Sequence, residues 1–377
     1  MNANPQHVVF AGGGTAGHLF PGLAVAEALR HAAPHVRITF VGGGKPFEIE
    51  QVRRAGFEYT TIPCRPLPRK ALETLRFLTD QFNGYYAARR LLREQHVSLV
   101  VGLGGYASVP AGRAAARLGV PYILLEQNAV PGRATRWLAP GAEMVCAAIE
   151  GIRPRLKHDC RVRLTGNPLR GEFLQARVPV QLLSDRLNRI RRLVVLGGSG
   201  GSQTLNQQVP MALYKAGAAL HDWQIIHQTG AHHVAGTGML YRKLGIRATV
   251  APFIENLPQV LRASHLAISR AGGTTLAELA VSRLPAIVLP YPQATDDHQR
   301  KNADVYAAAG AVRTLDQREL AGRLDNHLAS VIVELSTAPR LRVRMAEAMA
   351  RLARPGATRE VLRSIATVLG LAPAASA

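Results

Sequence analysis

The sequence predicts an α/β protein made of two Rossmann-like domains, each built on a parallel sheet, that face each other across a cleft. Two glycine-rich turns, at residues 12–17 and 197–202, lie about half a chain apart, and each follows an apolar run and precedes a helical pattern. Short apolar runs alternate with longer helical patterns, which is typical of a parallel sheet covered by helices on both faces. With 377 residues, 47% of them hydrophobic, the chain is too long for one ordinary core and fits two domains.

The first half starts with an apolar run at residues 8–11 that leads into the first glycine-rich turn. Because this run and the later ones are short and mainly apolar, we expect strands that are buried on both faces. The later predicted strands are 36–42, 99–103, 122–126 and 144–148, and the predicted helices are 21–31, 72–94 and 109–118.

The second half repeats this alternation, and residues 341–369 show a helical period. Its predicted strands are 193–196, 223–228, 248–253, 265–269 and 285–290. We therefore expect an N-terminal domain over 1–166, a linker over 167–189, a C-terminal domain over 190–345, and a C-terminal helix and tail over 346–377.

Composition limits the class of protein. The three cysteines are scattered and form no CxxC pair, which argues against a disulfide framework or a zinc site and for a reducing compartment. No apolar run approaches the roughly 20 residues that span a bilayer, and the N-terminus lacks the charged start of a signal peptide. The formal net charge is +21, but only six of the 46 basic residues are lysine and no nucleic-acid-binding motif is present. We expect a cytosolic protein with no nucleic-acid partner, and an anionic lipid or nucleotide explains the charge at least as well.

The glycine-rich turns predict phosphate binding. A strand that turns tightly into a helix points backbone N–H groups and the positive end of the helix dipole at whatever lies beyond. Neither turn ends in the Gly-Lys-Ser/Thr of a Walker A motif, so ATP hydrolysis is not expected.

Polar residues follow the predicted strands of the first half. His18 stands at the start of a helix, where it could act as a general base or simply pack. Tyr106 follows the turn Gly104-Gly105, and Glu126, Gln127 and Asn128 end another strand. Such a polar group is costly when buried without partners, so it is expected to meet a ligand or to close a hydrogen-bond network.

The second half carries a nucleotide-like pattern. The backbone at Ile254 could pair with a base edge, and the turn 271–275 supplies amides and hydroxyls for phosphate. Glu278 could bind the two hydroxyls of a ribose, or could be an ordinary glutamate on a helix surface. Amide side chains at Gln299 and Asn302 suit sugar hydroxyls. The run 296–298, Asp-Asp-His, has no second cluster of ligands, so we expect no metal site and no cofactor.

Taken together these residues resemble the MurG family of peptidoglycan N-acetylglucosaminyltransferases, and the resemblance covers most of the chain. The motifs occur in the family's order and are residues 13–18, 104–106, 126–128, 166–170, 197–199, 270–278, 298–299 and 302–303. The resemblance implies the GT-B fold and an inverting transfer of GlcNAc from UDP-GlcNAc to the MurNAc 4-hydroxyl of undecaprenyl-diphospho-MurNAc-pentapeptide (lipid I), which gives lipid II. It also implies a peripheral protein on the cytoplasmic side of the cell membrane.

The resemblance also implies roles for residues. His18 would be the general base, with Tyr106 and Glu126 in support, although Glu126 itself could be the base. Ile254 would meet the uracil, with Arg170 nearby, and Glu278 would hold the ribose. The diphosphate would be held by Ser199, Gly273, Thr274 and Thr275, and the sugar by Asn128 and Gln299 together with Thr15, Ala16 and Gly17. Leu276 and Ala277 would also contact UDP-GlcNAc.

One helical segment could contact the membrane. Leu72, Leu75, Leu78, Phe82 and Tyr85 or Tyr86 recur at helical spacing among several arginines. Such a stripe faces either the protein's own core or an anionic lipid surface, and with the resemblance we favour the lipid surface.

Two other functions remain open at this point. A UDP-GlcNAc 2-epimerase would share the fold and the nucleotide sugar, but its chemistry requires carboxylates and histidines around the sugar ring. A catalytically silent UDP-sugar-binding subunit would not need His18.

Overall fold

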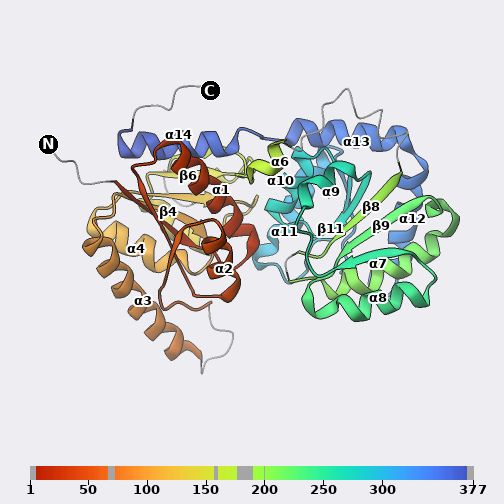
Figure 1. Ribbon diagram of the computed structural model, residues 1–377, viewed down its shortest axis with the longest axis horizontal. Coiled ribbons are helices and arrows are strands. Elements are labelled where there is room, and N and C mark those ends of the chain that lie inside the picture. The colour runs from red at the N-terminus through yellow and green to blue at the C-terminus, as the bar shows by residue number, and fades with distance from the viewer. Residues whose placement is uncertain (1–5, 67–72, 157–159, 176–189, 199, 372–377) are drawn as a thin grey trace. The chain divides into compact units, whose positions relative to one another are not determined.

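The computed structural model describes residues 6–66, 73–156, 160–175, 190–198 and 200–371. The chain divides into two compact units, of which unit 1 comprises Met1–Arg170 and Arg354–Ala377 and unit 2 comprises Gly171–Ala353. Each unit is a sheet with helices on both faces (Figure 1). The predicted class of two Rossmann-like domains with parallel sheets is confirmed, whereas the domain boundaries expected at 166, 189 and 345 stay a prediction.

Unit 1 is built on a seven-stranded sheet with the order β3-β2-β1-β4-β5-β6-β7, and every neighbouring pair is parallel. Strand β1 lies between β2 and β4, and its residues Val8 to Ala11 are therefore fully buried, as an uninterrupted apolar run predicts. The strands are β1 (His7–Gly12), β2 (Arg37–Gly42), β3 (Glu58–Thr61), β4 (Leu99–Gly104), β5 (Tyr122–Glu126), β6 (Met144–Ala147) and β7 (Val162–Leu164).

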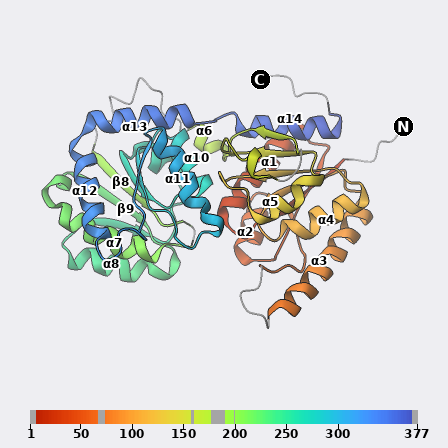
Figure 2. The same cartoon turned by 180° about the vertical axis from the view of Figure 1, so that it is seen from behind.

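The helices of unit 1 connect these strands, and one comes from the far end of the chain. Helix α14 packs beside α1, and its Val361 and Ile365 are fully buried in the core of unit 1 (Figures 1 and 2). The helical period expected over 341–369 is interrupted at residues 353–356, because Pro355 lacks the N–H that a continuous helix needs. The helices are α1 (Ala16–Ala32), α2 (Pro46–Arg54), α3 (Thr74–Glu94), α4 (Ser108–Leu118), α5 (Arg133–Leu138) and α14 (Ala357–Leu369).

Unit 2 has a six-stranded parallel sheet with the order β10-β9-β8-β11-β12-β13. Its strands are β8 (Arg191–Leu196), β9 (Trp223–Gln228), β10 (Ala248–Ala251), β11 (Leu266–Ser269), β12 (Ala286–Val288) and β13 (Val312–Thr314). Its helices are α6 (Gly171–Gln175), α7 (Gln203–Ala216), α8 (Val234–Lys243), α9 (Leu257–Ala263), α10 (Gly273–Val281), α11 (His298–Ala308), α12 (Leu324–Thr337) and α13 (Pro339–Leu352).

Each sheet contains one point at which the order of the strands reverses. In unit 1 the chain runs outward from β1 to β3 and then returns to place β4 on the other side of β1. In unit 2 it runs from β8 to β10 and returns to place β11 beside β8. In open α/β sheets, ligands bind outside the carboxyl ends of the strands at such a point. Both glycine-rich turns follow the central strands β1 and β8, so both lie at these points.

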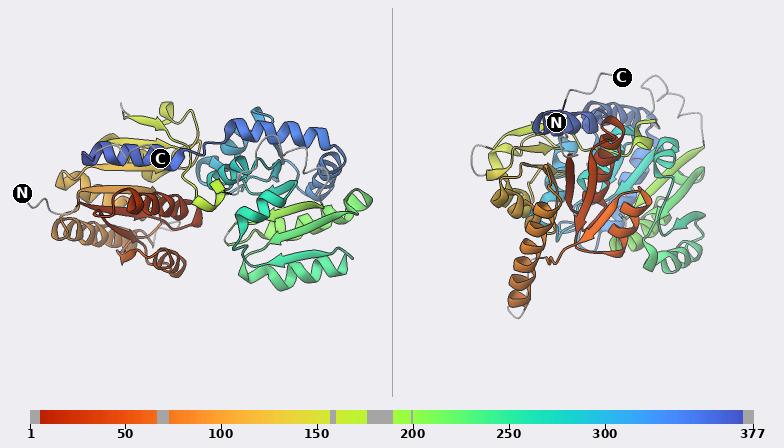
Figure 3. Two further views of the ribbon diagram at one scale, coloured as in Figure 1. Left: turned by 45° about the horizontal axis from the view of Figure 1, so that its top comes forward. Right: turned by 60° about the vertical axis from the view of Figure 1, so that its left-hand side comes forward.

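Helix α3 leaves its apolar stripe exposed. Its N-terminal turns extend beyond the neighbouring helices of unit 1 (Figure 3). Leu75 is 72% exposed and Phe82 62% exposed, and Leu78 and Tyr86 are also exposed, whereas Gly84, Ala88 and Leu92 form the buried face. Leu72 lies outside the described residues. Within the described part of the chain, no helix is long and apolar enough to cross a membrane.

An ion-pair network in unit 2 holds the turn that precedes α11. Asp296 and Asp297 both adopt positive φ, 53° and 54°, a conformation that is strained for residues other than glycine. The guanidinium of Arg318 donates to Asp297 Oδ2 at 3.3 Å and to both oxygens of the buried Asp316, at 2.6 and 3.1 Å. Arg300 on α11 donates to Asp316 at 2.7 Å. Through Arg318 and Arg300, Asp316 therefore links the strained turn to helix α11, which follows that turn.

The hydrogen bonds from Arg318 lower the pKa of Asp316 to about 2. A carboxyl whose pKa falls on folding stabilises the protein above its unfolded-state value, and this stabilisation is lost as the pH falls through the folded-state value. Asp316→Asn should thus lower the free energy of unfolding by about 1–2 kcal/mol between pH 5 and 8, after allowance for the exposure of Arg318. Urea unfolding at several pH values measures this, and the difference from the unaltered protein should shrink from about pH 4 and disappear near pH 2. A difference that does not depend on pH would contradict this account.

Candidate functional site

In unit 1 the loops after β1 and β4 touch each other. Gly12 has φ +127°, and a Cβ on it would lie 2.6 Å from the carbonyl oxygen of Gly104. No side chain fits there, so glycine is required for this close approach. The two loops thereby bring His18 and Tyr106, predicted from separate motifs, to one end of the sheet.

His18 lies in the first turn of α1, beside the loop after β4. Its Nδ1 is 3.1 Å from the hydroxyl oxygen of Thr15, the N-cap residue of α1, and Ala16 and Gly17 form the turn between them. A Cβ added at Gly104 would lie 3.1 Å from His18 Cδ2 and 3.6 Å from Gln127 Oε1. His18 and Gln127 therefore face the same small space.

Tyr106 borders the first glycine-rich turn. A Cβ added at Gly14 would lie 3.9 Å from Tyr106 Cε1, and the ammonium of Lys45 lies 5.9 Å from the centre of the Tyr106 ring. Burial raises the pKa of Tyr106, so its hydroxyl remains protonated at neutral pH and can donate a hydrogen bond.

Glu126 is buried and accepts four hydrogen bonds from the loop that follows it and from helix α5. One oxygen accepts from the backbone N–H of Asn128 at 3.0 Å and from its side-chain amide at 3.2 Å. The other accepts from the N–H of Gly132 at 2.9 Å and from the hydroxyl of Thr135 at 2.6 Å. The carboxylate thus orders residues 128–135, and Asn128 uses one of its amide hydrogens in this network. Arg170, also in unit 1, places its guanidinium 4.7 Å from the centre of the Phe20 ring.

In unit 2 the loop after β8 is also packed on neighbouring backbone. A Cβ at Gly201 would lie 1.9 Å from the carbonyl oxygen of Thr229, so this turn also needs glycine. The hydroxyl of Ser202 caps α7 by accepting from Leu205 N at 3.4 Å. Ser199 lies outside the described residues.

Helix α10 starts at the end of β11 with no capping side chain. Its N-cap residue is Gly272, and the first N–H groups of a helix have no carbonyl one turn earlier to bond. Gly273, Thr274, Thr275, Leu276, Ala277 and Glu278 all lie on α10. Glu278 is buried, so the interpretation as a glutamate on a helix surface is wrong.

Three residues predicted to suit a ligand form hydrogen bonds within unit 2. The N–H of Ile254 donates to Gln228 Oε1 at 3.0 Å, which leaves the Ile254 carbonyl as the backbone group for a base edge. Gln299 Oε1 accepts from the N–H of Tyr291 at 2.9 Å and from that of Ala271 at 3.2 Å. These bonds fix the orientation of the Gln299 amide, so its NH₂ group is the part left to meet a ligand. Asn302 is fully buried and donates to the carbonyl of Ala271 at 3.0 Å.

Arg270 connects the loops of unit 2, a role that the sequence did not reveal. It donates to Ser202 Oγ at 3.1 Å, to the carbonyls of Leu289 and Pro290 at 3.0 and 3.3 Å, and to Gln317 Oε1 at 2.9 Å. Burial lowers its pKa to about 10, so it remains charged at neutral pH. The sequence does show an arginine between an apolar strand and a Gly-Gly turn. It could not show which groups this arginine bonds, because they are far from it and from one another in the sequence.

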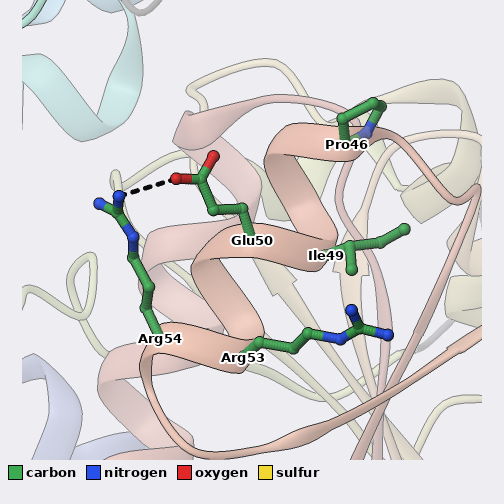
Figure 4. A pocket seen from close by; sticks show the side chains of 5 residues that line it. All are labelled: Pro46, Ile49, Glu50, Arg53 and Arg54. Carbon is green, nitrogen blue, oxygen red and sulfur yellow. Dashed lines mark ion pairs between the residues drawn. The ribbon is translucent and has the colours of Figure 1, made fainter.

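A metal site and a surface hollow are two further candidates for parts of the site. Among the residues that the structure describes, no three His, Cys, Asp or Glu side chains gather as a metal site would. A hollow of about 690 Å³ lies on the outer side of α2 and is lined by Pro46, Ile49, Glu50, Arg53 and Arg54 (Figure 4). None of these five residues is a predicted site residue.

Comparison with known proteins identifies the family. Residues 8–147 match the glycosyltransferase family 28 N-terminal domain, and residues 192–357 match its C-terminal domain. The chain is 39% identical over 358 residues to the UDP-N-acetylglucosamine–N-acetylmuramyl-(pentapeptide) pyrophosphoryl-undecaprenol N-acetylglucosamine transferase of Acidithiobacillus ferrooxidans, covering 94% of this chain and 95% of that protein. It is 37% identical to the protein of the same name from Pseudomonas syringae, covering 96% and 98%.

Solved structures agree with this result. The crystal structure of Acinetobacter baumannii MurG matches with a TM-score of 0.75 and 29% identity, over 96% of this chain and 100% of that one. A UDP-N-acetylglucosamine 2-epimerase from Listeria monocytogenes matches with a TM-score of 0.69 over 97% and 96% of the two chains, but at 12% identity it shares the fold alone. The chain is therefore a glycosyltransferase of the GT-B fold and belongs to the MurG family of N-acetylglucosaminyltransferases.

Proposed function

We propose that the protein transfers GlcNAc from UDP-GlcNAc to the 4-hydroxyl of MurNAc in undecaprenyl-diphospho-MurNAc-pentapeptide, with inversion at the anomeric carbon. One observation carries the proposal: relatives named for this transfer align with 94–96% of the chain. In support, His18 and Tyr106 follow β1 and β4, the strands at which the order reverses in unit 1, and the start of α10 follows β11, which lies beside β8 at the reversal in unit 2.

His18 is the proposed general base. When its Nδ1–H donates to the Thr15 hydroxyl, Nε2 is the nitrogen that can accept a proton. The acceptor hydroxyl would attack the anomeric carbon, a C–O bond would form, and the bond to UDP would break with its electrons moving to the diphosphate. The hydroxyl proton would pass to Nε2. The four donors on Glu126 support a positioning role for that residue rather than the role of base.

Unit 2 is proposed to bind the donor. The N-terminus of α10, whose N-cap residue is Gly272, suits the diphosphate because the positive end of the helix dipole lies there, and it would stabilise the charge that develops on the diphosphate as UDP departs. Glu278 would hold the ribose, and the NH₂ group of Gln299 would donate to the sugar. The carbonyl of Ile254 would accept a hydrogen bond from the base, while its N–H stays with Gln228 unless that side chain moves.

UDP release from UDP-GlcNAc, measured with and without a short-chain lipid I analogue in EDTA, tests the proposal. We expect release that depends on the acceptor and persists in EDTA. Conversion of the donor sugar without acceptor would indicate epimerase chemistry, and tight donor binding without turnover would indicate a silent binding subunit. Either result would contradict the proposal.

His18→Ala should lower kcat by about 10²–10⁴-fold, because general base catalysis is lost. The Kd for UDP-GlcNAc should change little, since the proposed donor groups lie on other residues. Steady-state kinetics and calorimetric titration measure the two quantities, and His35→Ala, an exposed histidine after α1, is a matched control. Full turnover in His18→Ala would remove the base assignment.

We further propose that α3 contacts the cytoplasmic leaflet of the membrane and brings the lipid-linked acceptor to unit 1. Its exposed Leu75, Leu78, Phe82 and Tyr86 form an apolar stripe, and Arg76 and Arg90 are exposed on the same helix. An apolar stripe with basic neighbours binds anionic lipid surfaces through both burial and charge.

The double variant Arg76→Glu/Arg90→Glu should weaken binding to vesicles that contain anionic phospholipid by at least about tenfold. Vesicle co-sedimentation at low and physiological salt measures this. The exposed Arg340 on α13 offers a control, because Arg340→Glu changes the charge in the same direction on another element. Equal binding by the double variant and the unaltered protein would exclude this surface.

A further inference from the structure

The first glycine-rich turn is held by side chains from α2. The carboxylate of Glu48, which is 1% exposed, accepts a hydrogen bond from the N–H of Gly14 at 2.5 Å. Lys45, the N-cap residue of α2, donates from its ammonium to the carbonyl oxygen of Gly14 at 2.8 Å. Both polar backbone groups of Gly14 are therefore bonded by residues more than 30 positions away in sequence.

Tyr59 on β3 fixes the other oxygen of this carboxylate. Its hydroxyl donates to Glu48 Oε2 at 2.6 Å and accepts from the N–H of Gly44 at 3.0 Å. Burial raises the pKa of Tyr59, so the hydroxyl keeps the proton that it donates. A Cβ added at Gly13 would lie 3.3 Å from Glu48 Cδ, so the turn is packed directly on the carboxylate.

This arrangement changes what the turn can bind. Glycine-rich turns at helix N-termini bind anions because their N–H groups are unpaired. Here the N–H of Gly14 already has an anionic partner within the protein, and a phosphate group at the same place would be repelled by the Glu48 carboxylate. The turn is also bonded through the N–H of Gly13, which donates to the Gly104 carbonyl at 3.5 Å.

We propose that Glu48, oriented by Tyr59, is a positioning residue for transfer, and that the first glycine-rich turn binds no substrate phosphate at Gly14. Glu48 sets the backbone of Gly14, which directly precedes Thr15, and Thr15 in turn contacts His18. The inference rests on the proposed function for its kinetic part, because His18 is the proposed base. Its structural part, the bond between Glu48 and Gly14, can be tested without any activity.

The structural test is amide hydrogen exchange of Gly14 in the full chain. We expect slow exchange in the unaltered protein and exchange at least about tenfold faster in Glu48→Ala, because the N–H loses its buried acceptor. Tyr59→Phe removes a single oxygen atom and should accelerate exchange less. Glu50→Ala is the matched control, since Glu50 lies on the outer side of the same helix and pairs with Arg54 at 2.8 Å (Figure 4).

The kinetic test compares these variants at a temperature where thermal unfolding shows all of them to be folded. Glu48→Ala should lower kcat by about 10²-fold, the scale expected when a catalytic group is misplaced by about 1 Å, with the KM for UDP-GlcNAc within about twofold. Glu48→Gln should recover part of the loss, because an amide oxygen still accepts from Gly14. Tyr59→Phe should give a smaller decrease, and Glu50→Ala none.

The outcomes are distinguishable. Unchanged exchange at Gly14 in both Glu48→Ala and Tyr59→Phe would overturn the positioning role, as would an unchanged kcat in both. A raised KM for UDP-GlcNAc with unchanged kcat in Glu48→Ala would show that Glu48 supports donor binding and not the transfer step, and would also overturn the inference. An unaltered protein without transferase activity would overturn the proposed function, whereas the exchange result would still decide how Gly14 is held.

Discussion

The pairing of β1 with β4, and of β8 with β11, is the constraint on which the polar clusters of both units depend. Each pair joins strands that are separated in sequence by two further strands, and each places the ends of both strands at the same edge of the sheet. Parallel pairing makes this possible because every strand then points the same way. For this reason the segments that carry His18 and Tyr106 lie at one edge of the sheet in unit 1, and the second glycine-rich turn and the segment that leads into α10 lie at one edge of the sheet in unit 2.

Close packing at these edges explains why glycines are needed there. The carbonyl of Gly104 occupies the space where a side chain at residue 12 would lie, and the carbonyl of Thr229 does the same at residue 201. Loops that approach this closely must also satisfy one another's backbone groups, since an unpaired buried N–H or C=O is costly. Arg270 in unit 2 and the pair Glu48 and Lys45 in unit 1 supply these partners.

The internal hydrogen bonds also define what remains for ligands. Gln299 uses its oxygen on two backbone N–H groups, so the contact with the sugar that we propose falls to its NH₂ group. Ile254 uses its N–H on Gln228 and keeps its carbonyl. Both groups are therefore oriented by bonds within the protein, and such orientation would reduce the entropy lost in the proposed binding of the donor. In unit 1, hydrogen bonds to Glu126 order the loop that follows it, and the N–H of Gly14 is already bonded to Glu48.

Local patterns of the sequence determined the elements. Mainly apolar runs identified most of the parallel strands, and two strands, 122–126 and 223–228, were predicted with their observed limits, because alternation between such runs and turn residues is a local property. Strands β3, β7 and β13, each only three or four residues long, were not predicted. The tail was expected to be helical, but the break at Pro355 and the return of α14 to unit 1 were not foreseen from its period.

The tertiary structure alone decided which of these residues are neighbours and which atoms are used internally. Residue types and order identified His18, Tyr106 and the α10 turn as candidates, but could not show that Glu48 bonds Gly14, 34 residues away, or that Asp316 holds the turn before α11. The exposure of the α3 stripe was equally undetermined, because an amphipathic helix has the same period against a core and against solvent or lipid. Periodicity is set by each residue's near neighbours in the chain, whereas partners, burial and orientation are set by the packing of segments that are distant in sequence.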